Sequence, residues 1–284
     1  MRCDLHVHTL HSGMCGIPGL HSVVRESYHQ PEAVYARLKE LGMDLVTITD
    51  HDSIEAVESL RRHPDFFLSE EVTCRMPDGT QVHLGVYDIT DRDHVEVQRR
   101  AEDFLSLVAY LRERRILFSA NHVFSSLTGA RRLADFDWLT TFVPAFETQN
   151  GLMPAANNQQ ARRFAKWNRK ISVGGSDAHA LASVGNAWTE VCGARNKREF
   201  FEGVRAGRAR ALGADGSYVK LTRDVVTIAA CAMKEHPLLL ALSPLMLAIP
   251  LVTLGNYCRE AAFGRYWMSR LQSAEMPVEL ETAA

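Results

Sequence analysis

The sequence DLHVHTLHS, residues 4–12, begins with alternating polar and apolar residues, and two of the polar ones are histidines. Residues i and i+2 of a β-strand lie on the same face, so His6 and His8 leave this strand on one side. Two histidines at this spacing are weak evidence for a metal site by themselves, because a metal ion needs further ligands that reach the same place. The rest of the chain must supply them.

Seven apolar stretches of strand length alternate with helix-like stretches, which is typical of a sheet wrapped by helices. The expected strands are 3–8, 44–49, 66–72, 82–88, 116–121, 144–148 and 171–176. The expected helices are 31–42, 94–114, 158–169 and 196–206. We therefore predict an α/β fold, and a parallel barrel would open the carboxyl ends of all its strands on one face.

Histidine is unevenly distributed along the chain, since eleven of the twelve lie within the first 179 residues. Eight His, Asp and Glu residues in or after the expected strands are candidate metal ligands. They are His6, His8, His51, Glu71, His83, His122, Asp177 and His179. This set exceeds the three or four ligands of one zinc ion and suits two or three ions that share a bridging carboxylate. The sequence predicts a multinuclear hydrolytic site.

Seven segments, in chain order, resemble the motifs of the polymerase and histidinol phosphatase (PHP) superfamily of metal-dependent phosphoesterases. They are DLHVHTLHS (4–12), TDHDS (49–53), EVT (71–73), HLGVY (83–87), NHVF (121–124), ETQN (147–150) and GSDAH (175–179). The resemblance implies a distorted seven-stranded β/α barrel, similar to a TIM barrel. It also implies two or three divalent ions of manganese, iron or zinc.

The resemblance further assigns the candidate ligands to individual ions. One ion would be held by His6, His8, Glu71 and Asp177, a second by Glu71, His83 and His122, and a third in part by His51 and His179. Asp50 and His51 are the implied catalytic groups. Asp4, Asp50 and Asp52 would orient ligating imidazoles, although Asp4 or Asp50 could touch a metal directly.

The chain departs from the family pattern where many members have Asp or His shortly after HTxxS. Here the sequence reads Ser12-Gly13-Met14-Cys15. We therefore expect the third ion to be weakly bound, absent, or completed by Cys15 or a water molecule. The alternative for Cys15 is a small buried side chain. Among the remaining histidines, His11 and His29 are the next candidates for contact with a metal ion.

Groups that could contact a substrate follow the predicted ligand His122. The segment SSLTGARR (125–132) carries Arg131 and Arg132, and arginine suits bidentate phosphate recognition. Asn150 could face polar groups of the substrate. A solvated loop leading into a helix is the alternative interpretation of the arginine pair.

The predicted activity is hydrolysis of a phosphomonoester of a small molecule, such as a nucleotide or a sugar phosphate, by a hydroxide shared between two ions. One alternative is a phosphodiesterase or exonuclease acting on short oligonucleotides. Another is a non-catalytic interaction module stabilised by metal. With 32 Lys+Arg and 34 Asp+Glu the net charge is -2, so there is no strong nucleic-acid signal and a phosphorylated small molecule is favoured.

Cellular location is predicted from the cysteines and the N-terminus. The six cysteines are scattered and form no CxxC pair, which favours a reduced, cytoplasmic protein. MRCDLHVHT leaves no room for a secretion signal.

The amino-acid composition of the chain changes after about residue 214. Residues 237–255, PLLLALSPLMLAIPLVTLG, form an uncharged run of nineteen residues interrupted by three prolines. A helix needs about 20 apolar residues to cross a bilayer. We predict a phosphoesterase domain at 1–214 and a helical extension at 215–284. Segment 237–255 would associate with a membrane, or pack against the barrel or a partner subunit.

Overall fold

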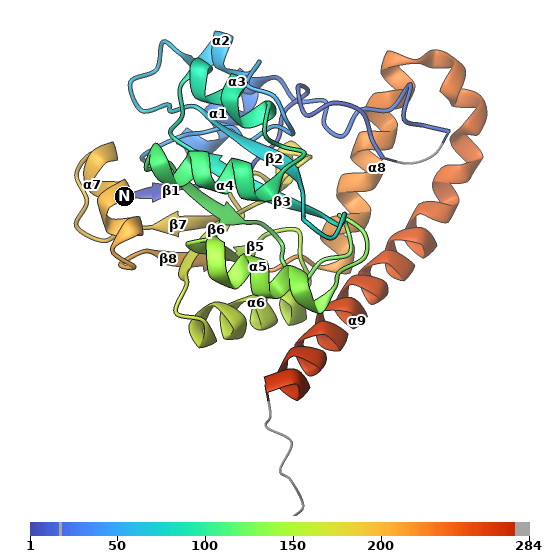
Figure 1. Ribbon diagram of the computed structural model, residues 1–284. Helices are drawn as coiled ribbons and strands as arrows, with labels where there is room; N and C mark the ends of the chain where they lie inside the picture. The colour runs from blue at the N-terminus through green and yellow to red at the C-terminus, as the bar shows by residue number, and fades with distance from the viewer. Residues whose placement is uncertain (17–18, 276–284) are drawn as a thin grey trace, which may run out of the picture.

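A computed structural model describes residues 1–16 and 19–275 and shows an α/β fold (Figure 1). This confirms the predicted fold class. A three-stranded sheet has the order β1 (Arg2–Cys3), β7 (Ala187–Glu190), β8 (Arg210–Gly213). A five-stranded sheet has the order β2 (Ser69–Arg75), β3 (Gln81–Tyr87), β4 (Leu117–Ala120), β5 (Ala145–Asn150), β6 (Ile171–Gly175).

The strands are not all parallel, contrary to the expectation of a parallel barrel. β3 runs antiparallel to both β2 and β4, whereas β4, β5 and β6 are parallel. Only five residues, 76–80, join β2 to β3, and a parallel crossover needs a dozen or more. The reversal places the start of β3, with His83, at the edge of the sheet where its neighbours end.

The seven-stranded barrel is also not formed as one continuous sheet. Segments 4–8 and 44–51 lie between β6 and β2 but join them through isolated parallel bridges, including Val7 to Ala178 and His51 to Glu71. In these segments several main-chain N–H groups donate to side chains instead of a neighbouring strand. Val7 N donates to Thr49 Oγ1, for example. The regular ladder is lost there because its donors are used to hold polar side chains.

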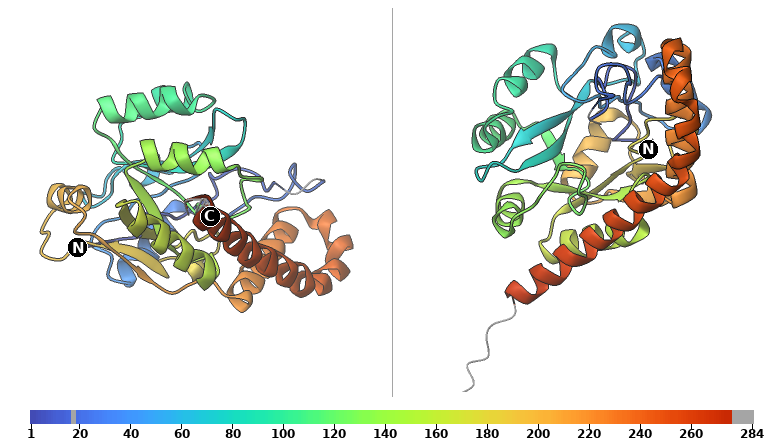
Figure 2. Two further views of the ribbon diagram at one scale, coloured as in Figure 1. Left: turned by 60° about the horizontal axis from the view of Figure 1, so that its bottom comes forward. Right: turned by 90° about the vertical axis from the view of Figure 1, so that its right-hand side faces the viewer.

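Helices cover the sheets from outside (Figures 1 and 2). The α-helices are α1 (Pro31–Glu40), α2 (Val57–Leu60), α3 (Asp91–Gln98), α4 (Phe104–Glu113), α5 (Leu133–Phe142), α6 (Ala155–Trp167), α7 (Lys197–Arg205), α8 (Tyr218–Glu235) and α9 (Ile249–Glu275). The 3-10 helices are η1 (Leu181–Ser183) and η2 (Pro237–Ala248).

The single helix expected at 94–114 is two helices. Asp103 accepts a hydrogen bond from Ser106 N and begins α4, and an N-cap residue of this kind starts a new helix. Strands β7 and β8 and helices α2 and α5 were not anticipated; all but α5 have only four residues.

The largest apolar core lies between the five-stranded sheet and helices α3 to α6. Trp267, Met268 and Leu271 of α9 belong to it, so the far end of the C-terminal extension packs into the domain core. The carboxylate of Glu260, also on α9, accepts hydrogen bonds from Ser125 and Ser126 in the loop after β4. The domain boundary proposed near residue 214 stays a prediction, but α9 is firmly attached to what precedes it.

Candidate metal centre

Glu71 of β2 lies in the middle of a cluster of buried histidines. Its Oε2 is 3.2 Å from His6 Nε2 and 3.1 Å from His51 Nδ1. Its Oε1 is 3.4 Å from His83 Nδ1 and 3.3 Å from His122 Nε2. The two oxygens of one carboxylate therefore face different sets of imidazoles, as expected of a carboxylate that bridges two ions.

Asp177 provides the second carboxylate of the cluster. Its Oδ1 lies 3.3 Å from His8 Nε2 and 3.5 Å from both His6 Nε2 and His179 Nε2. Gly175 makes this approach possible, because a Cβ there would lie 2.4 Å from the main-chain N of His6. The glycine that begins GSDAH lets this segment lie directly against the first expected strand.

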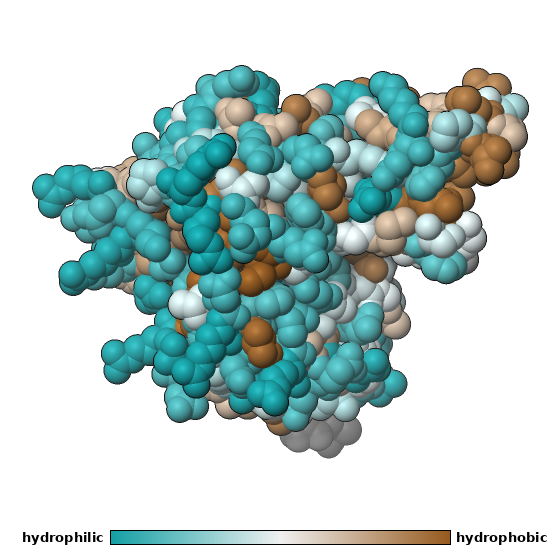
Figure 3. Space-filling model, turned by 90° about the horizontal axis from the view of Figure 1, so that it is seen from above, coloured by the Kyte–Doolittle hydropathy of each residue, from teal (hydrophilic) through white to brown (hydrophobic). Residues whose placement is uncertain are grey.

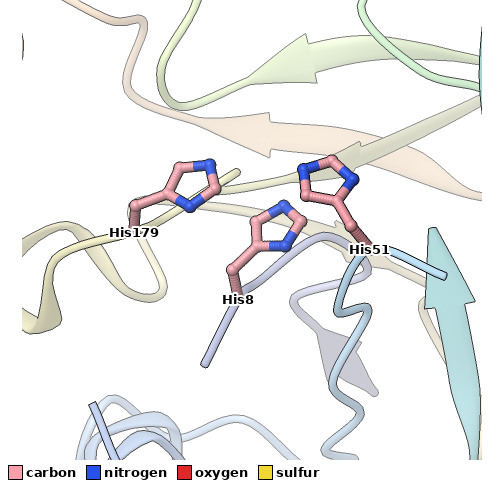
Figure 4. Close-up of side chains that lie close together, drawn as sticks. All are labelled: His8, His51 and His179. Atoms are coloured by element: carbon pink, nitrogen blue, oxygen red, sulfur yellow. The ribbon is translucent and has the colours of Figure 1, made fainter. Parts of the chain in front are cut away.

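Four groups of three side chains bring a ligand atom from each member within 4.8 Å of the others. The groups are His6–His8–Asp177, His6–Glu71–His122, His51–Glu71–His83 and His8–His51–His179. Figure 4 shows the last group, with three imidazole rings side by side from three separate chain segments. All eight ligands predicted from the sequence belong to at least one group.

Unsatisfied polar atoms test whether divalent ions fit this cluster. Among the described residues, His6 Nε2, His8 Nε2, Glu71 Oε2 and His83 Nδ1 are buried without a hydrogen-bond partner. Leaving one such group unsatisfied costs about 1–3 kcal/mol. Imidazole nitrogens and carboxylate oxygens are ligands of zinc, manganese and iron. The cluster therefore fits divalent metal ions.

The charge states of Glu71, Asp177 and His51 suit the same conclusion, although burial is outweighed by nearby carboxylates, which raise the pKa of His6, His122 and His179. Burial raises the pKa of Glu71, but His6 and His83 outweigh burial and hold this pKa well below its ordinary value. The pKa of Asp177 is likewise well lowered: burial raises it and His6 opposes that most strongly. Burial holds the pKa of His51 well below the ordinary value. At neutral pH the two carboxylates are charged and the His51 imidazole is neutral, as metal ligands must be.

Glu147 of β5 orients the cluster from behind, a role that sequence analysis missed. Its Oε1 is 2.8 Å from His6 Nδ1, and its Oε2 accepts hydrogen bonds from His122 N and Asn150 Nδ2. A hydrogen bond on one ring nitrogen leaves the other, Nε2, to face the cluster. The only sequence signal was the ETQN stretch, in which no role was assigned to the glutamate.

The three aspartates expected to orient imidazoles differ in their contacts. His8 Nδ1 lies 2.8 Å from Ser12 Oγ, which donates to Asp50 Oδ1 at 2.7 Å, so Asp50 acts on His8 through a serine. Asp4 instead accepts main-chain N–H groups, among them that of His6. Asp52 is exposed and accepts a hydrogen bond from Thr73 N. Among the described residues, none of the three joins the metal-binding groups.

Glu26 is a further acid that sequence analysis did not consider. Its Oε2 lies 3.2 Å from His51 Nε2, and this buried oxygen has no hydrogen-bond partner among the described residues. Burial raises the pKa of Glu26 to about 7, although His179 opposes the shift. Glu26 N donates to Gly13 O, so the chain returns after Cys15 and brings a carboxylate back to the cluster.

Cys15 itself is half-buried and belongs to none of the four groups formed by the described residues. Sequence reasoning sought the completing ligand next to Ser12. The structure instead places Glu26 beside His51. The chain folds back after Cys15, and this fold brings Glu26 to the histidine cluster.

The three residues predicted to contact a substrate lie in different environments. Asn150 is buried and donates to the carboxylates of Glu147 and Asp177. Arg131 is 5% exposed and donates to Gln81 O and Thr128 Oγ1. Arg132 is exposed at the start of α5. Asn150 thus orients carboxylates and Arg131 holds its own loop, while contact of any of the three with a substrate stays a prediction.

One segment of the chain matches a known protein family. Residues 155–209, from α6 to the end of the α7 region, match a family model described as PHP-associated. This segment of the chain is therefore similar to PHP-associated proteins. The match covers the segment that contains GSDAH, and the remaining motifs precede it in the order given above. No protein of curated function matches the chain in sequence.

Comparison with solved structures concerns the fold alone. PsfC from Pseudomonas syringae is 18% identical with a TM-score of 0.57, over 82% of this chain and 98% of PsfC. The lesion-specific endonuclease PfuEndoQ from Pyrococcus furiosus is 16% identical with a TM-score of 0.49, over 74% of this chain and 58% of that protein. An amidohydrolase from Chromobacterium violaceum is 13% identical with a TM-score of 0.47, over 74% of this chain and 97% of that protein. Only PsfC is similar enough to support a shared fold.

Proposed function

We propose that this protein is a metal-dependent phosphoesterase of the PHP type that hydrolyses a phosphomonoester of a small molecule, such as a nucleotide or a sugar phosphate. The observation that carries the proposal is the position of Glu71, whose two buried oxygens face different histidines. When bound there, divalent ions lower the pKa of coordinated water towards about 7 and neutralise charge on phosphate oxygens. Phosphate ester hydrolysis needs both effects.

The side chains divide between two principal ion positions. His6, His8 and Asp177 would hold one ion with Glu71 Oε2, and His83 and His122 a second with Glu71 Oε1. His51, His179 and Glu26 surround a possible third position. We propose manganese, iron or zinc, because mixed imidazole and carboxylate ligands suit all three.

The substrate must approach from the edge of the cluster that is open to solvent. The side chains of His6, His8 and His122 are at most 2% exposed and form its floor. Those of His51, His83 and His179 are 16–20% exposed. Exposure confined to these partly buried side chains favours a small phosphate group. The net charge of -2 also provides no basic track for long nucleic acid.

The proposal is tested by measuring phosphate release from an aryl phosphate by the full chain reconstituted with Mn²⁺. A panel of phosphorylated metabolites, an aryl phosphodiester and short oligonucleotides should be assayed alongside. We expect monoesters to be the better substrates. Hydrolysis of the diester or oligonucleotides alone would favour the exonuclease alternative, and failure to bind metal even after reconstitution would contradict both enzymatic readings.

Glu70 provides a matched control beside Glu71. It is also buried on β2, but its carboxylate contacts His94 and Gln98 on α3, outside the cluster. Glu71→Gln should abolish phosphate release and lower the bound metal, whereas Glu70→Gln should retain both. Tight metal binding without hydrolysis of any substrate would support the non-catalytic module.

A further inference from the structure

The structure leaves a contiguous apolar surface exposed on the C-terminal extension. We call residues 237–254 the apolar tip; they comprise η2 and the start of α9. Eight of its large apolar side chains are exposed: Leu238, Leu240, Leu242, Leu245, Leu247, Leu251, Val252 and Leu254. Leu238 and Leu247 are 91% and 87% exposed. Figure 3 shows hydrophobic residues gathered on a projecting corner of the molecule, and large exposed patches of this kind mark interaction sites.

The exposed side chains surround the tip instead of forming one face. Successive residues of a 3-10 helix are turned by about 120°, so Leu238, Leu240 and Leu242 of η2 point in three directions. A protein partner would cover one face of such a helix. A helix that is apolar all round is stable only in an apolar surrounding, either a protein core or a lipid phase.

Both ends of the tip are attached to the same domain. Before it, Glu235 pairs with Arg25. At its other end, Thr253 Oγ1 lies 2.7 Å from Thr222 Oγ1 of α8, and beyond it Glu260 accepts a hydrogen bond from Ser125. The chain therefore leaves the domain and returns to it on the same side, as Figures 1 and 2 show.

This attachment decides how the tip could meet a membrane. By length and composition alone, Pro237–Ala274 could cross one. However, a single crossing would put the two ends on opposite sides, and α9 returns to the domain core. Insertion from one side of the membrane agrees with the attachment of both ends of the tip to the same domain. The prolines at 237, 244 and 250 also interrupt a continuous transmembrane helix.

Charges on either side of the tip complement anionic lipid. The tip contains no charged residue, and the exposed cations Lys234 and Arg259 stand before and after it. Neither forms an ion pair within the part of the chain that the structure describes. The nearby acids are already engaged, Glu235 by Arg25 and Glu260 by Ser125. Lys and Arg next to an inserted segment attract lipid phosphates.

We propose that the apolar tip docks on an anionic lipid bilayer, with its leucines inserted from one side and Lys234 and Arg259 at the headgroups. The segment that leads into the tip is connected to the metal centre, because Arg25, which binds Glu235, precedes Glu26 in the chain.

The test is flotation of the full, metal-loaded chain with vesicles of phosphatidylcholine, with or without phosphatidylglycerol. Wild type should float, and more so with the anionic lipid. Leu245→Glu with Leu247→Glu should weaken binding to both vesicles by tenfold or more. Lys234→Gln with Arg259→Gln should remove the preference for anionic lipid.

Val95→Glu with Leu105→Glu is the matched control. These side chains are exposed on α3 and α4, away from the tip, so flotation should be unchanged. Metal content and melting temperature should stay constant in every variant. The proposal is overturned if wild type does not float, or if the Leu245/Leu247 variant floats as well as wild type. A dimer that this variant converts to a monomer, without binding of wild type to vesicles, would also overturn it and identify a contact between copies.

Discussion

The metal centre and the apolar tip depart from ordinary protein architecture in opposite ways. The metal centre buries carboxylates and imidazoles, several of them without a hydrogen-bond partner among the described residues. The tip exposes leucines that would normally be buried. Each arrangement is costly for the chain alone, and we propose that each cost is removed by a different partner, divalent ions in one case and an apolar phase in the other. The comparison shows that buried polar groups and exposed apolar side chains can indicate a binding site as clearly as a sequence motif does.

The largest expected effect is on the metal centre, through Asp177→Asn. This change keeps the size of the side chain but removes the charge that faces His6 and His8. We expect phosphate release to fall by roughly 10²–10³-fold or more, as for loss of other groups that stabilise transition-state charge. Metal analysis and steady-state kinetics measure the effect. Unchanged metal content and rate would show that Asp177 is not a ligand.

Removal of metal should have the next largest effect, on stability. Ions that bind only the folded state at a thousand times their dissociation constant stabilise it by about 4 kcal/mol. For a domain of this size the melting temperature should fall by roughly 8–16 °C on chelation. The difference should shrink as the pH falls towards about 5, because protons compete with ions for the imidazoles. Equal melting temperatures with and without chelator would contradict a metal-stabilised cluster.

Glu147→Gln should weaken the metal centre without removing a ligand. The change weakens the interaction of this side chain with His6 Nδ1, and loss of such an orienting partner typically lowers metal affinity by about 10–100-fold. Competition with a chelating dye measures the affinity. Asp52→Asn serves as the control, since Asp52 contacts only the main chain of Thr73 in the described structure. Similar losses in both variants would point to a general effect on folding.

The smallest expected effect concerns the anchor between the two regions. Glu260 of α9 is buried and binds Ser125 and Ser126, which follow the ligand His122. Glu260→Gln should lower the free energy of unfolding by about 1–2 kcal/mol while metal content is kept. Denaturant unfolding measures it, with the exposed Glu113→Gln as the control. Loss of metal in the Glu260 variant would show that the tip and the metal centre are coupled more tightly than their contacts indicate.

Much of the fold was predictable where the signal is local. Strands β2 to β6 lie close to their expected positions, since runs of apolar residues bounded by turns specify a buried strand. The direction of β3 was not recognised, although the five-residue connection at 76–80 contained the reason. The first two expected strands lack regular ladders, because main-chain N–H groups in or next to them donate to side chains, as Val7 N does to Thr49 and Thr9 N to Asp50.

The site shows the same division between local and distant information. Its eight proposed ligands were found because each stands in a recognisable motif near a strand end. Glu26 and Glu147 were missed as partners of His51 and His6, because nothing in their own neighbourhoods shows where they will lie. Asn150 donates to two carboxylates in the structure, which its sequence context did not indicate, and its contact with a substrate stays a prediction.

By itself the sequence determined which donor atoms are present and where an uncharged, apolar segment lies, because both are properties of consecutive residues. Only the tertiary structure decided which oxygen of Glu71 faces which histidine, and that Glu26 returns to His51. It also decided that the apolar tip leaves and re-enters the domain on one side. These features depend on distances between residues far apart in the chain, which are set by packing of the whole fold and not by local composition.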